Sequence, residues 1–542
     1  MIARLAYKTF VIFSFAVLLT LSSNIAFAKV EILDTEFTGT INETGSYSDV
    51  SGNKNFSFVD EGSHLTNDFL IKAKKRLKHE WKWDMDVRVR KTTDQEVDTR
   101  QDVHLLQLTT RVSNPNSQFQ FGDYYTRFTD MTLNRSLEGF NYQANYNKVG
   151  TRLNLVAARQ YRGFDNIQYS RYVWGYHFDQ DLIKKKFLFI NQWTVGQTIA
   201  QTFDRRGSIG QDTGVPDLNN LVGSINTRIR AIEDLNVNIE LGKSMTGDHN
   251  DILLAGDIYG YAFRLRSDYR KKSRFGQTYL NFDYEWIAPN FAALSGSVLS
   301  DREAYYAGIT QNFNQNLSAI VQFRAIRNNL DDTSFTTTRT ANPRFSLRIM
   351  PFNKVPDFVI SPYYDLRSTH ASNSTIDNNV QLVGVEATKR IWFNVKMNAG
   401  YDLRKRLDDA GVTDETANDY HMGFSYDWIR DNIRISPNFD FRLRNDRFDD
   451  VPNRTTFRNF VWGVSSEFYK RFRVYFNYGI NYDDRSFADS DTNYFSWNVS
   501  GEYDLLDNLM LVIGWRQYDQ HFQRNISDFE ENVGSIRLQY KY

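Results

Sequence analysis

Cysteine is absent from this chain of 542 residues. Without thiols the protein has no disulfide, no thiolate metal site and no covalently attached haem, so any redox centre has to come from a partner. Proline is scarce too, with 9 residues, and no Pro/Gly-rich linker separates one part of the chain from another. We therefore expect a single domain without covalent cross-links.

Long apolar runs are also rare. The mean hydropathy is −0.54, and after residue 28 no run approaches the roughly 20 apolar residues that a transmembrane helix requires. Yet aromatic residues make up 15% of the chain, and 31 of them are tyrosines. A membrane β-barrel reconciles this polarity with residence in a membrane, because only alternate residues of each strand meet lipid.

No excess of one charge sign marks the chain. It has 65 basic and 65 acidic residues. Removing Arg4 and Lys8 with a signal peptide leaves 63 basic residues against 65 acidic ones. This balance gives no electrostatic basis for binding nucleic acid.

The first 28 residues have the features of a secretory signal peptide. Arg4 and Lys8 precede an apolar run over residues 10–21, and small residues follow in the Ala-Phe-Ala sequence of residues 26–28. We expect cleavage before Lys29, because the apolar run is shorter than a membrane anchor needs. The signal peptide is then residues 1–28, and the mature protein is residues 29–542.

Period-two alternation of polar and apolar residues fills most of the chain, most clearly residues 393–404 and 534–542. Successive side chains of a strand face opposite sides, so such a segment puts apolar groups on lipid and polar groups in a lumen. The pattern predicts an all-β fold, a transmembrane antiparallel up-and-down β-barrel integral to the cell outer membrane. A soluble β-sandwich or propeller also alternates, but it does not account for so many aromatic strand ends.

Tight turns and long polar loops alternate along the chain, and this alternation predicts about 26 strands. The first strand is expected near residues 36–47. Long polar loops are expected at residues 407–418, 445–454 and 483–493, and residues 289–302 are interpreted as a strand end plus an outer loop. Short turns face the periplasm and long loops face outward in such barrels. Tight turns are expected near residues 76–79, 113–117, 147–150, 180–185, 232–235, 271–276, 312–316, 351–355, 389–390, 428–432, 470–471 and 506–508.

Charged side chains recur on the face opposite the apolar one. An Arg or Lys facing lipid at mid-membrane costs about 2–4 kcal/mol, so these side chains are expected to face the lumen. Arginine is more frequent than acidic residues at these positions, and one hypothesis is that such a lumen selects anions or docks an acidic partner. The alternative, which we favour, is that Arg and Asp pair across neighbouring strands and stiffen a wide wall. The expected lumen residues are Asp84, Asp86, Arg88, Arg90, Arg228, Arg230, Arg264, Arg266, Arg324, Arg434, Asp440, Arg442, Arg444, Arg473, Arg516 and Arg537.

One early segment, residues 121–139, departs from strand-like alternation. It resembles a Gly-Asp…Phe…Leu…Arg…Leu…Gly element of several large outer-membrane barrels. A barrel of about 26 strands encloses more space than its side chains fill, so something has to constrict the lumen. Residues 122–139 are our first candidate for this constriction, and the alternative is that they form an irregular, bulged strand pair. Residues 29–64 are a second candidate, and the alternative is that they form a periplasmic leader followed by the first strand. The marked residues of the candidate constriction are Gly122, Asp123, Arg127, Phe128, Arg135 and Gly139.

No residue pattern supports catalysis or a cofactor. Eight histidines show neither paired-ligand spacing nor a neighbouring nucleophile motif. Loop carboxylates such as Asp446, Asp449 and Asp450 supply the hard oxygens that calcium prefers, but they lack EF-hand spacing. We therefore expect no enzyme, no metal site and no cofactor. The histidines are His64, His79, His104, His177, His249, His370, His421 and His521.

The chain resembles the large porin-like β-barrels of bacterial outer membranes. In that group the final strand ends in an aromatic residue that the barrel-insertion machinery recognises, and Tyr542 stands where Phe is usual. Strand count, size and the lack of a cysteine-bound cofactor also resemble the barrels of porin–cytochrome complexes, some of which carry a Cys pair that is missing here. A TonB-dependent transporter fits poorly, because strand-like alternation begins by Phe69 and leaves no room for that family's globular plug.

These features predict a channel with a polar, Arg-rich lumen. The alternative is a structural sheath that encloses a multihaem cytochrome in an electron conduit across the outer membrane. An export or adhesion barrel is a third option. The expected partners are the lipid bilayer and the insertion machinery, with multihaem cytochromes added under the sheath hypothesis. Neighbouring genes that encode repeated Cys-x-x-Cys-His motifs would favour the sheath.

Overall fold

The computed structural model describes residues 30–541, except 33, 58, 60, 95–96, 99–102, 161–170, 205–217, 232–233, 249–257, 332–335, 353–356, 374–375, 392–393, 409–413, 450–453, 486–490 and 523–527. The expected signal peptide and Tyr542 lie outside the described residues, as do His249 and Asp450. Within the described part, no helix is long and apolar enough to cross a membrane.

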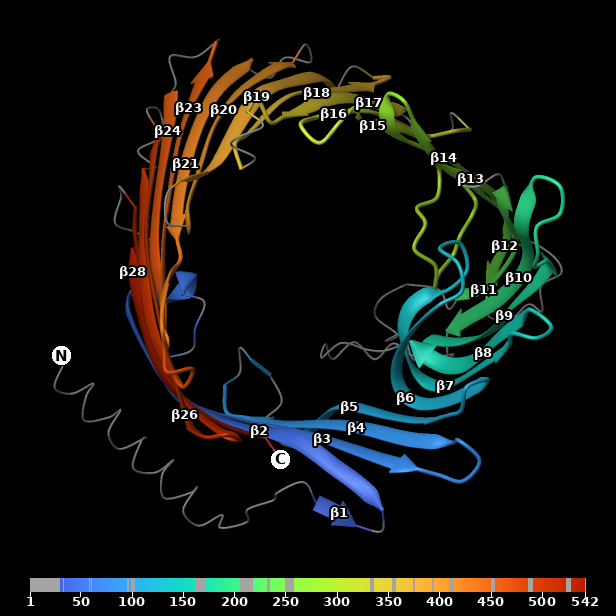
Figure 1. Ribbon diagram of the computed structural model, residues 1–542, viewed down its shortest axis with the longest axis horizontal. Coiled ribbons are helices and arrows are strands. Elements are labelled where there is room, and N and C mark those ends of the chain that lie inside the picture. The colour runs from blue at the N-terminus through green and yellow to red at the C-terminus, as the bar shows by residue number, and fades with distance from the viewer. Residues whose placement is uncertain are drawn as a thin grey trace.

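One closed antiparallel sheet forms the molecule (Figure 1). The sheet has 28 strands, of which β1 (Val30–Ile32) pairs only with β2, and β22 (Trp428–Arg430) continues β21 beside β23. The other 26 form the wall. The first and last wall strands, β2 and β28, join through 13 residue pairs from Thr40↔Lys541 to Gly52↔Phe529. The predicted barrel and its strand count are confirmed.

The wall strands are β2 (Thr35–Gly52), β3 (Gly62–Arg76), β4 (Lys82–Thr92), β5 (His104–Ser113), β6 (Ser117–Arg127), β7 (Asn134–Tyr146), β8 (Thr151–Gln160), β9 (Arg171–Ile183), β10 (Ile190–Asp204), β11 (Leu218–Ala231), β12 (Leu235–Asp248), β13 (Ile258–Ser273), β14 (Gly276–Ile287), β15 (Arg302–Asn312), β16 (Leu317–Asn328), β17 (Thr338–Ile349), β18 (Val359–Ala371), β19 (Asp377–Ile391), β20 (Val395–Asp408), β21 (Glu415–Tyr426), β23 (Ile433–Phe448), β24 (Arg454–Phe468), β25 (Phe472–Arg485), β26 (Thr492–Leu506), β27 (Leu509–Phe522) and β28 (Phe529–Lys541).

The alternation of the sequence becomes two chemically distinct faces. On the outer face, aromatic rings of adjacent strands pack against each other, as in Phe441 with Phe460, whose centroids are 4.8 Å apart. Tyr401 and Tyr420 pack in the same way at 4.9 Å. Such cross-strand pairs stabilise a sheet by up to about 1 kcal/mol each. The polar members of the same strands line the interior.

Connections at one end of the barrel are tight turns close to the predicted positions. Two differ: residues 389 and 390 belong to β19, whose turn comes later, where Asn394 has φ +68°, and residues 428–430 form β22. Residues 232–233 and 353–355 of two other expected turns lie outside the described residues. Predicted loops at the other end are shorter than expected, because β20, β23 and β25 continue to Asp408, Phe448 and Arg485. Strand pairing continues there beyond the apolar part of each strand, so the alternation of polar and apolar residues placed the strand ends too early. Residues 288–301 form one loop between β14 and β15, where a strand end plus an outer loop was expected over residues 289–302.

Candidate functional site

The β6–β7 hairpin leaves the barrel wall. β6 pairs with β5 over only five residue pairs, from Ser113↔Gln118 to Thr109↔Gly122. Its pairing with β7 continues further, to Arg127↔Asn134. Beyond Gly122 the hairpin therefore separates from β5, and Figure 1 shows it curling into the ring.

Residues 122–139 are strand for most of their length. Gly122 pairs with Gly139, and only residues 128–133 form a loop. The segment is therefore a strand pair, as the alternative had it, and this pair leaves the wall beyond Gly122. Regular alternation is lost because both faces of the inward part of the hairpin lie inside the barrel.

A Gly-Asp pair directs this departure. Gly122 has φ +92°, and a Cβ there would lie 1.8 Å from the carbonyl oxygen of Leu108, so only glycine fits. Asp123 then ends the ladder: its Oδ2 accepts a hydrogen bond from the Leu108 N–H at 2.7 Å. The Thr109 hydroxyl donates to the Asp123 carbonyl at 2.6 Å. The last rung is thereby capped, which keeps the backbone groups paired where the strands diverge.

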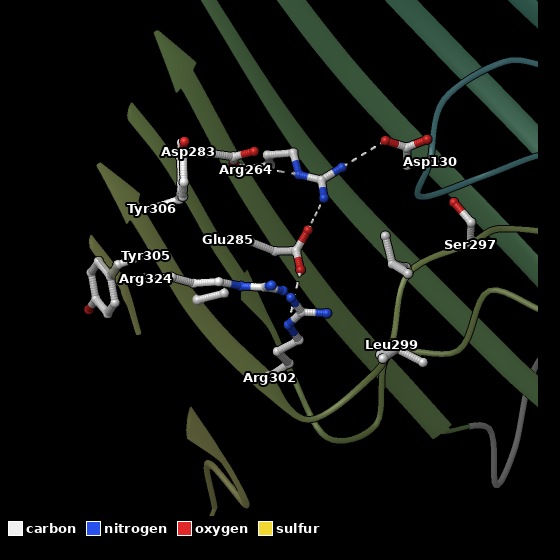
Figure 2. A pocket seen from close by; sticks show the side chains of 12 residues that line it. Asp130, Arg264, Asp283, Glu285, Ser297, Leu299, Arg302, Tyr305, Tyr306 and Arg324 are labelled. Carbon is white, nitrogen blue, oxygen red and sulfur yellow. Dashed lines mark hydrogen bonds and ion pairs between the residues drawn. The ribbon is translucent and has the colours of Figure 1, made fainter. Parts of the chain in front are cut away.

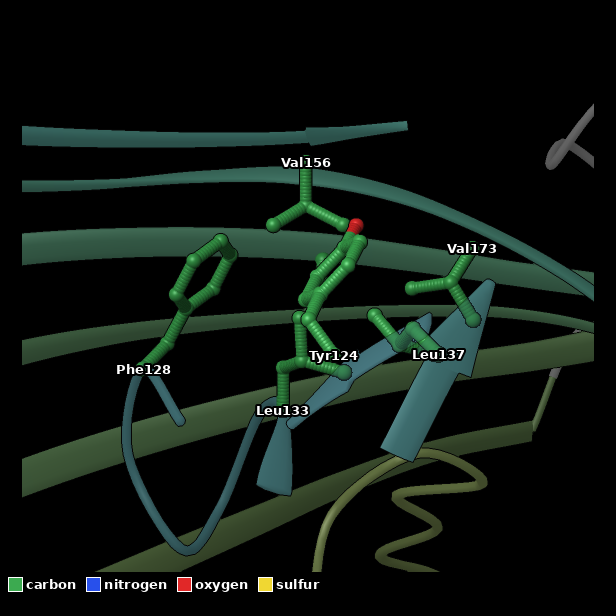
Figure 3. Close-up of a cluster of buried hydrophobic side chains, with 7 residues drawn as sticks. Tyr124, Phe128, Leu133, Leu137, Val156 and Val173 are labelled. Carbon is green, nitrogen blue, oxygen red and sulfur yellow. The ribbon is translucent and has the colours of Figure 1, made fainter. Parts of the chain in front are cut away.

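Apolar side chains fix the hairpin to the inner face of β8–β10 (Figure 3). Leu133 and Leu137 are completely buried. The full cluster comprises Tyr124, Phe128, Leu133, Leu137, Val156, Val173 and Ala200. Burial of a Leu side chain contributes about 1.5–3 kcal/mol, so several such side chains hold the hairpin firmly against the wall.

The loop of residues 288–301 also turns inward and packs on the hairpin tip. Phe291 is buried with Met131 of the tip and with Val222, Ala262 and Ile287 of the wall. Backbone hydrogen bonds join the two segments: Asn134 N–H donates to the Ser295 carbonyl, and Ser297 N–H donates to the Asp130 carbonyl, each at 2.9 Å. The two segments form one inner layer on the β8–β14 side of the barrel.

An ion-pair network ties this inner layer to the wall (Figure 2). Arg264 Nη1 lies 3.0 Å from Oδ2 of Asp130, and its Nη2 contacts Glu285. Arg302 reaches the other oxygen of Glu285 at 3.6 Å. Asp130 also pairs with Arg127 at 2.7 Å. The network borders a cavity of about 380 Å³.

The strand registers place all sixteen expected lumen residues on one face of the wall, opposite the apolar one. Neighbouring strands show this directly, because Arg264 lies between Glu240 and Glu285 while Phe263 lies beside Trp286. Carboxylates pair with many of the arginines, and among the described residues Arg230, Arg324 and Arg537 make no ion pair. The paired arginines of the expected set are Arg88, Arg90, Arg228, Arg264, Arg266, Arg434, Arg442, Arg444, Arg473 and Arg516.

Two of the pairs are strongly asymmetric in the exposure of their side chains. The Arg442 side chain is 52% exposed while its partner Asp419 is 12% exposed. For Arg228 and Asp179 the values are 46% and 5%. In both pairs the short acidic side chain stays close to the wall and the long arginine extends beyond it. In these two pairs the guanidinium group is more exposed than its carboxylate, whereas Arg264 and Asp130 are about equally exposed, at 14% and 16%.

Several polar residues of the interior were not singled out from the sequence. Glu240 is buried beneath the hairpin tip, and His177 stacks on Phe128 while its Nδ1 lies 2.8 Å from the Thr198 hydroxyl. No sequence pattern around these residues identifies them, because the residues they contact come from other strands. No cluster of three His, Asp or Glu side chains suited to a metal ion occurs in the part of the chain that the structure describes.

Comparison with known proteins finds only distant similarity. No protein-family model and no curated protein sequence matches the chain. Among solved structures it is similar to the outer membrane transporter YddB from Escherichia coli, with 9% identity, a TM-score of 0.43, and coverage of 93% of this chain and 81% of that one. It is similar to the P pilus usher (PapC) translocation pore, with 7% identity, a TM-score of 0.34 and coverage of 93% and 99%.

OprD from Pseudomonas aeruginosa is a third similar structure, with 11% identity, a TM-score of 0.33 and coverage of 70% and 96%. The class of the protein follows from its own architecture. A closed 26-strand wall, apolar outside and polar inside, is an integral outer-membrane β-barrel.

Proposed function

We propose that this barrel is a diffusion channel that favours anionic solutes and is narrowed by the β6–β7 hairpin together with residues 288–301. The observation that carries the proposal is the exposure asymmetry of the ion pairs, in which Arg228 and Arg442 extend past their buried carboxylate partners. Charges of one sign that line a confined bore set its ion selectivity.

Four arginines gather in one cavity of about 490 Å³ on the inner wall. Arg152, Arg228, Arg230 and Arg266 line it together with the amide side chains of neighbouring strands, while Asp268 is the one carboxylate in the lining. Guanidinium groups offer several N–H donors to a carboxylate or phosphate. This cavity supports transient binding of an anion on its way through the barrel.

The selectivity test measures the reversal potential of single channels in a planar bilayer under a salt gradient. The wild-type protein is expected to prefer anions, and the double variant Arg228→Gln/Arg442→Gln is expected to lose most of that preference. Asn477→Gln is the matched control, because Asn477 faces the lumen and carries no charge. A cation-selective wild-type channel contradicts the proposal.

The constriction is tested by replacing residues 126–135 with Asn-Gly, which closes a two-residue hairpin turn. Single-channel conductance should rise several-fold, because this change removes Phe128, Met131 and Leu133 from the inner layer. Unchanged conductance in a properly folded variant would exclude the hairpin as the constriction.

A structural sheath for a multihaem cytochrome is the second candidate. Its support is the number of wall strands, since barrels of about 22 strands already hold a plug inside, and this wall has 26. Gentle purification from native membranes followed by absorption spectroscopy separates the two functions. A haem spectrum that co-purifies with the barrel favours the sheath, and a colourless, conducting barrel favours the channel.

A further inference from the structure

A serine, a histidine and an aspartate line up on the outer surface of the barrel, near the end that carries the longer loops. The Ser368 hydroxyl lies 2.7 Å from Nε2 of His370. The other ring nitrogen of His370, Nδ1, lies 2.5 Å from Oδ1 of Asp377, an ion-pair contact without the geometry of a hydrogen bond. A hydroxyl on one nitrogen and a carboxylate on the other is the arrangement that activates a serine nucleophile.

We propose that Ser368, His370 and Asp377 form a catalytic site that hydrolyses carboxylic esters of long-chain acyl groups at the outer membrane surface. The proposal is independent of the channel function, because all three side chains lie on the lipid-facing side of the wall. The site was not visible as a motif, since the serine and the histidine are simply two residues apart in an alternating strand.

The sheet geometry assembles these residues. Ser368 and His370 share one face of β18, where alternate residues point the same way. Asp377 is the first residue of β19 and pairs directly with His370 in the ladder. The connection between the strands is anchored by the Ala371 N–H, which donates to the Ile376 carbonyl at 2.7 Å. All three groups are therefore supported by regular strands rather than by a long loop.

Accessibility distinguishes this group from a similar one inside the barrel. His177 also lies between a hydroxyl and a carboxylate, those of Thr198 and Asp179. Thr198, however, is only 1% exposed, so no substrate reaches it. The His370 side chain is 53% exposed, so an ester carbonyl can approach Ser368.

The surroundings of Ser368 indicate the substrate class. Asn379 lies directly opposite Ser368 on β19, and side chains paired in this way have Cβ atoms about 4.5–5.5 Å apart. Its amide can donate to the oxyanion that forms when the carbonyl is attacked. Arg339, opposite His370 on β17, supplies an exposed positive charge for an anionic head group.

The same outer face is apolar farther along the strands toward the middle of the membrane. Phe345, Tyr364 and Val383 lie there and are exposed on this face. An acyl chain inserted in the outer leaflet can lie along them while its ester bond stays at the level of Ser368. A polar, activated serine above an apolar surface suits a lipid-like ester better than a small soluble one.

The reaction consumes water and leaves the enzyme unchanged. His370 Nε2 accepts the Ser368 proton as Oγ bonds to the ester carbonyl carbon, and the resulting imidazolium gives that proton to the departing alcohol. Water then loses a proton to His370 and attacks the acyl-serine. The carboxylic acid leaves, and Ser368 recovers its proton. Asp377 lies beside Nδ1 and stabilises the imidazolium electrostatically.

The test uses the full-length refolded barrel in detergent micelles, an alkyl fluorophosphonate probe and a chromogenic long-chain ester. The probe should form a phosphonyl ester with Ser368 Oγ and release fluoride, and peptide mass analysis locates the adduct. Ser368→Ala should lose both labelling and ester hydrolysis. Ser361→Ala is the matched control, because Ser361 lies on the same strand but faces the lumen.

Two further variants separate catalysis from a merely structural contact. Asp377→Asn should lower kcat by about a hundredfold or more, since general base catalysis contributes that much. Asn379→Ala should lower kcat with little change in KM, because its contact forms only in the transition state. Absence of labelling at Ser368 in a correctly folded barrel, or hydrolysis that survives Ser368→Ala, would overturn the proposal. Channel conductance should be the same in all of these variants.

Discussion

A depth series of arginine substitutions in β25 tests the facing of the wall quantitatively. Ile480 lies near the middle of the strand, and its neighbours in the adjacent strands are Phe460 and Phe495, both on the outer face. Ile480→Arg puts a charge against the hydrocarbon centre and should lower the free energy of unfolding by about 2–4 kcal/mol.

Two other positions of the same strand provide the comparison. Val474 also faces outward, but it lies close to the tight turn between β24 and β25, so Val474→Arg should cost about 0–1 kcal/mol. Asn477 faces the lumen, where its amide lies 3.3 Å from Asn498 Oδ1. Asn477→Arg should therefore be close to neutral, because the new guanidinium stays in the polar interior.

The assay is reversible denaturant unfolding of the barrel in lipid vesicles, followed by the fluorescence of its 10 tryptophans. The expected order of stability loss is Ile480→Arg, then Val474→Arg, then Asn477→Arg. Equal losses for Ile480→Arg and Asn477→Arg would refute the assignment of the two faces. Equal losses for Ile480→Arg and Val474→Arg would refute the depth that the structure gives them.

Three further predictions concern topology and the hairpin. An epitope tag at Asp449 should bind antibody on intact cells and one at Lys470 should not, and the opposite result would invert the barrel. Gly122→Ala should lower the free energy of unfolding by about 1–3 kcal/mol, because its Cβ meets the Leu108 carbonyl at a left-handed φ; a stability equal to that of the wild type would argue against the backbone path at this residue. Leu137→Ala should cost about 2–5 kcal/mol in the same assay, because the side chain is completely buried; a loss below 1 kcal/mol would contradict the packing of the hairpin on the wall.

The sequence predicts the wall well because its signals are local. Alternation with a period of two depends only on neighbouring residues, and it places Arg442 and Phe441 on opposite faces without knowledge of any partner strand. Turns such as residues 469–471 interrupt this alternation visibly. The strand count, and the face of the wall on which each charged residue lies, could therefore be predicted residue by residue.

The Gly-Asp pair at residues 122 and 123 could also be recognised from local sequence, but the position of the hairpin that follows it could not. The sequence indicated an unusual segment, and it could not show that the hairpin stays paired while it leaves β5. That outcome depends on Val156, Val173 and Ala200, which provide an apolar patch on the inner wall. Hydropathy alone gives no reason to expect apolar side chains on the lumen face of these strands.

The sequence by itself determined that this chain is a large outer-membrane barrel with charged residues facing inward, because the strand period and the cost of charge in lipid are properties of each strand separately. Only the tertiary structure decided how the charges pair, where the hairpin lies and which residues meet Ser368. Those contacts join different strands, and the register of each ladder, which the sequence did not supply, fixes them. His370 and Asp377 illustrate this, since their contact across a hairpin depends on one direct pairing in that register.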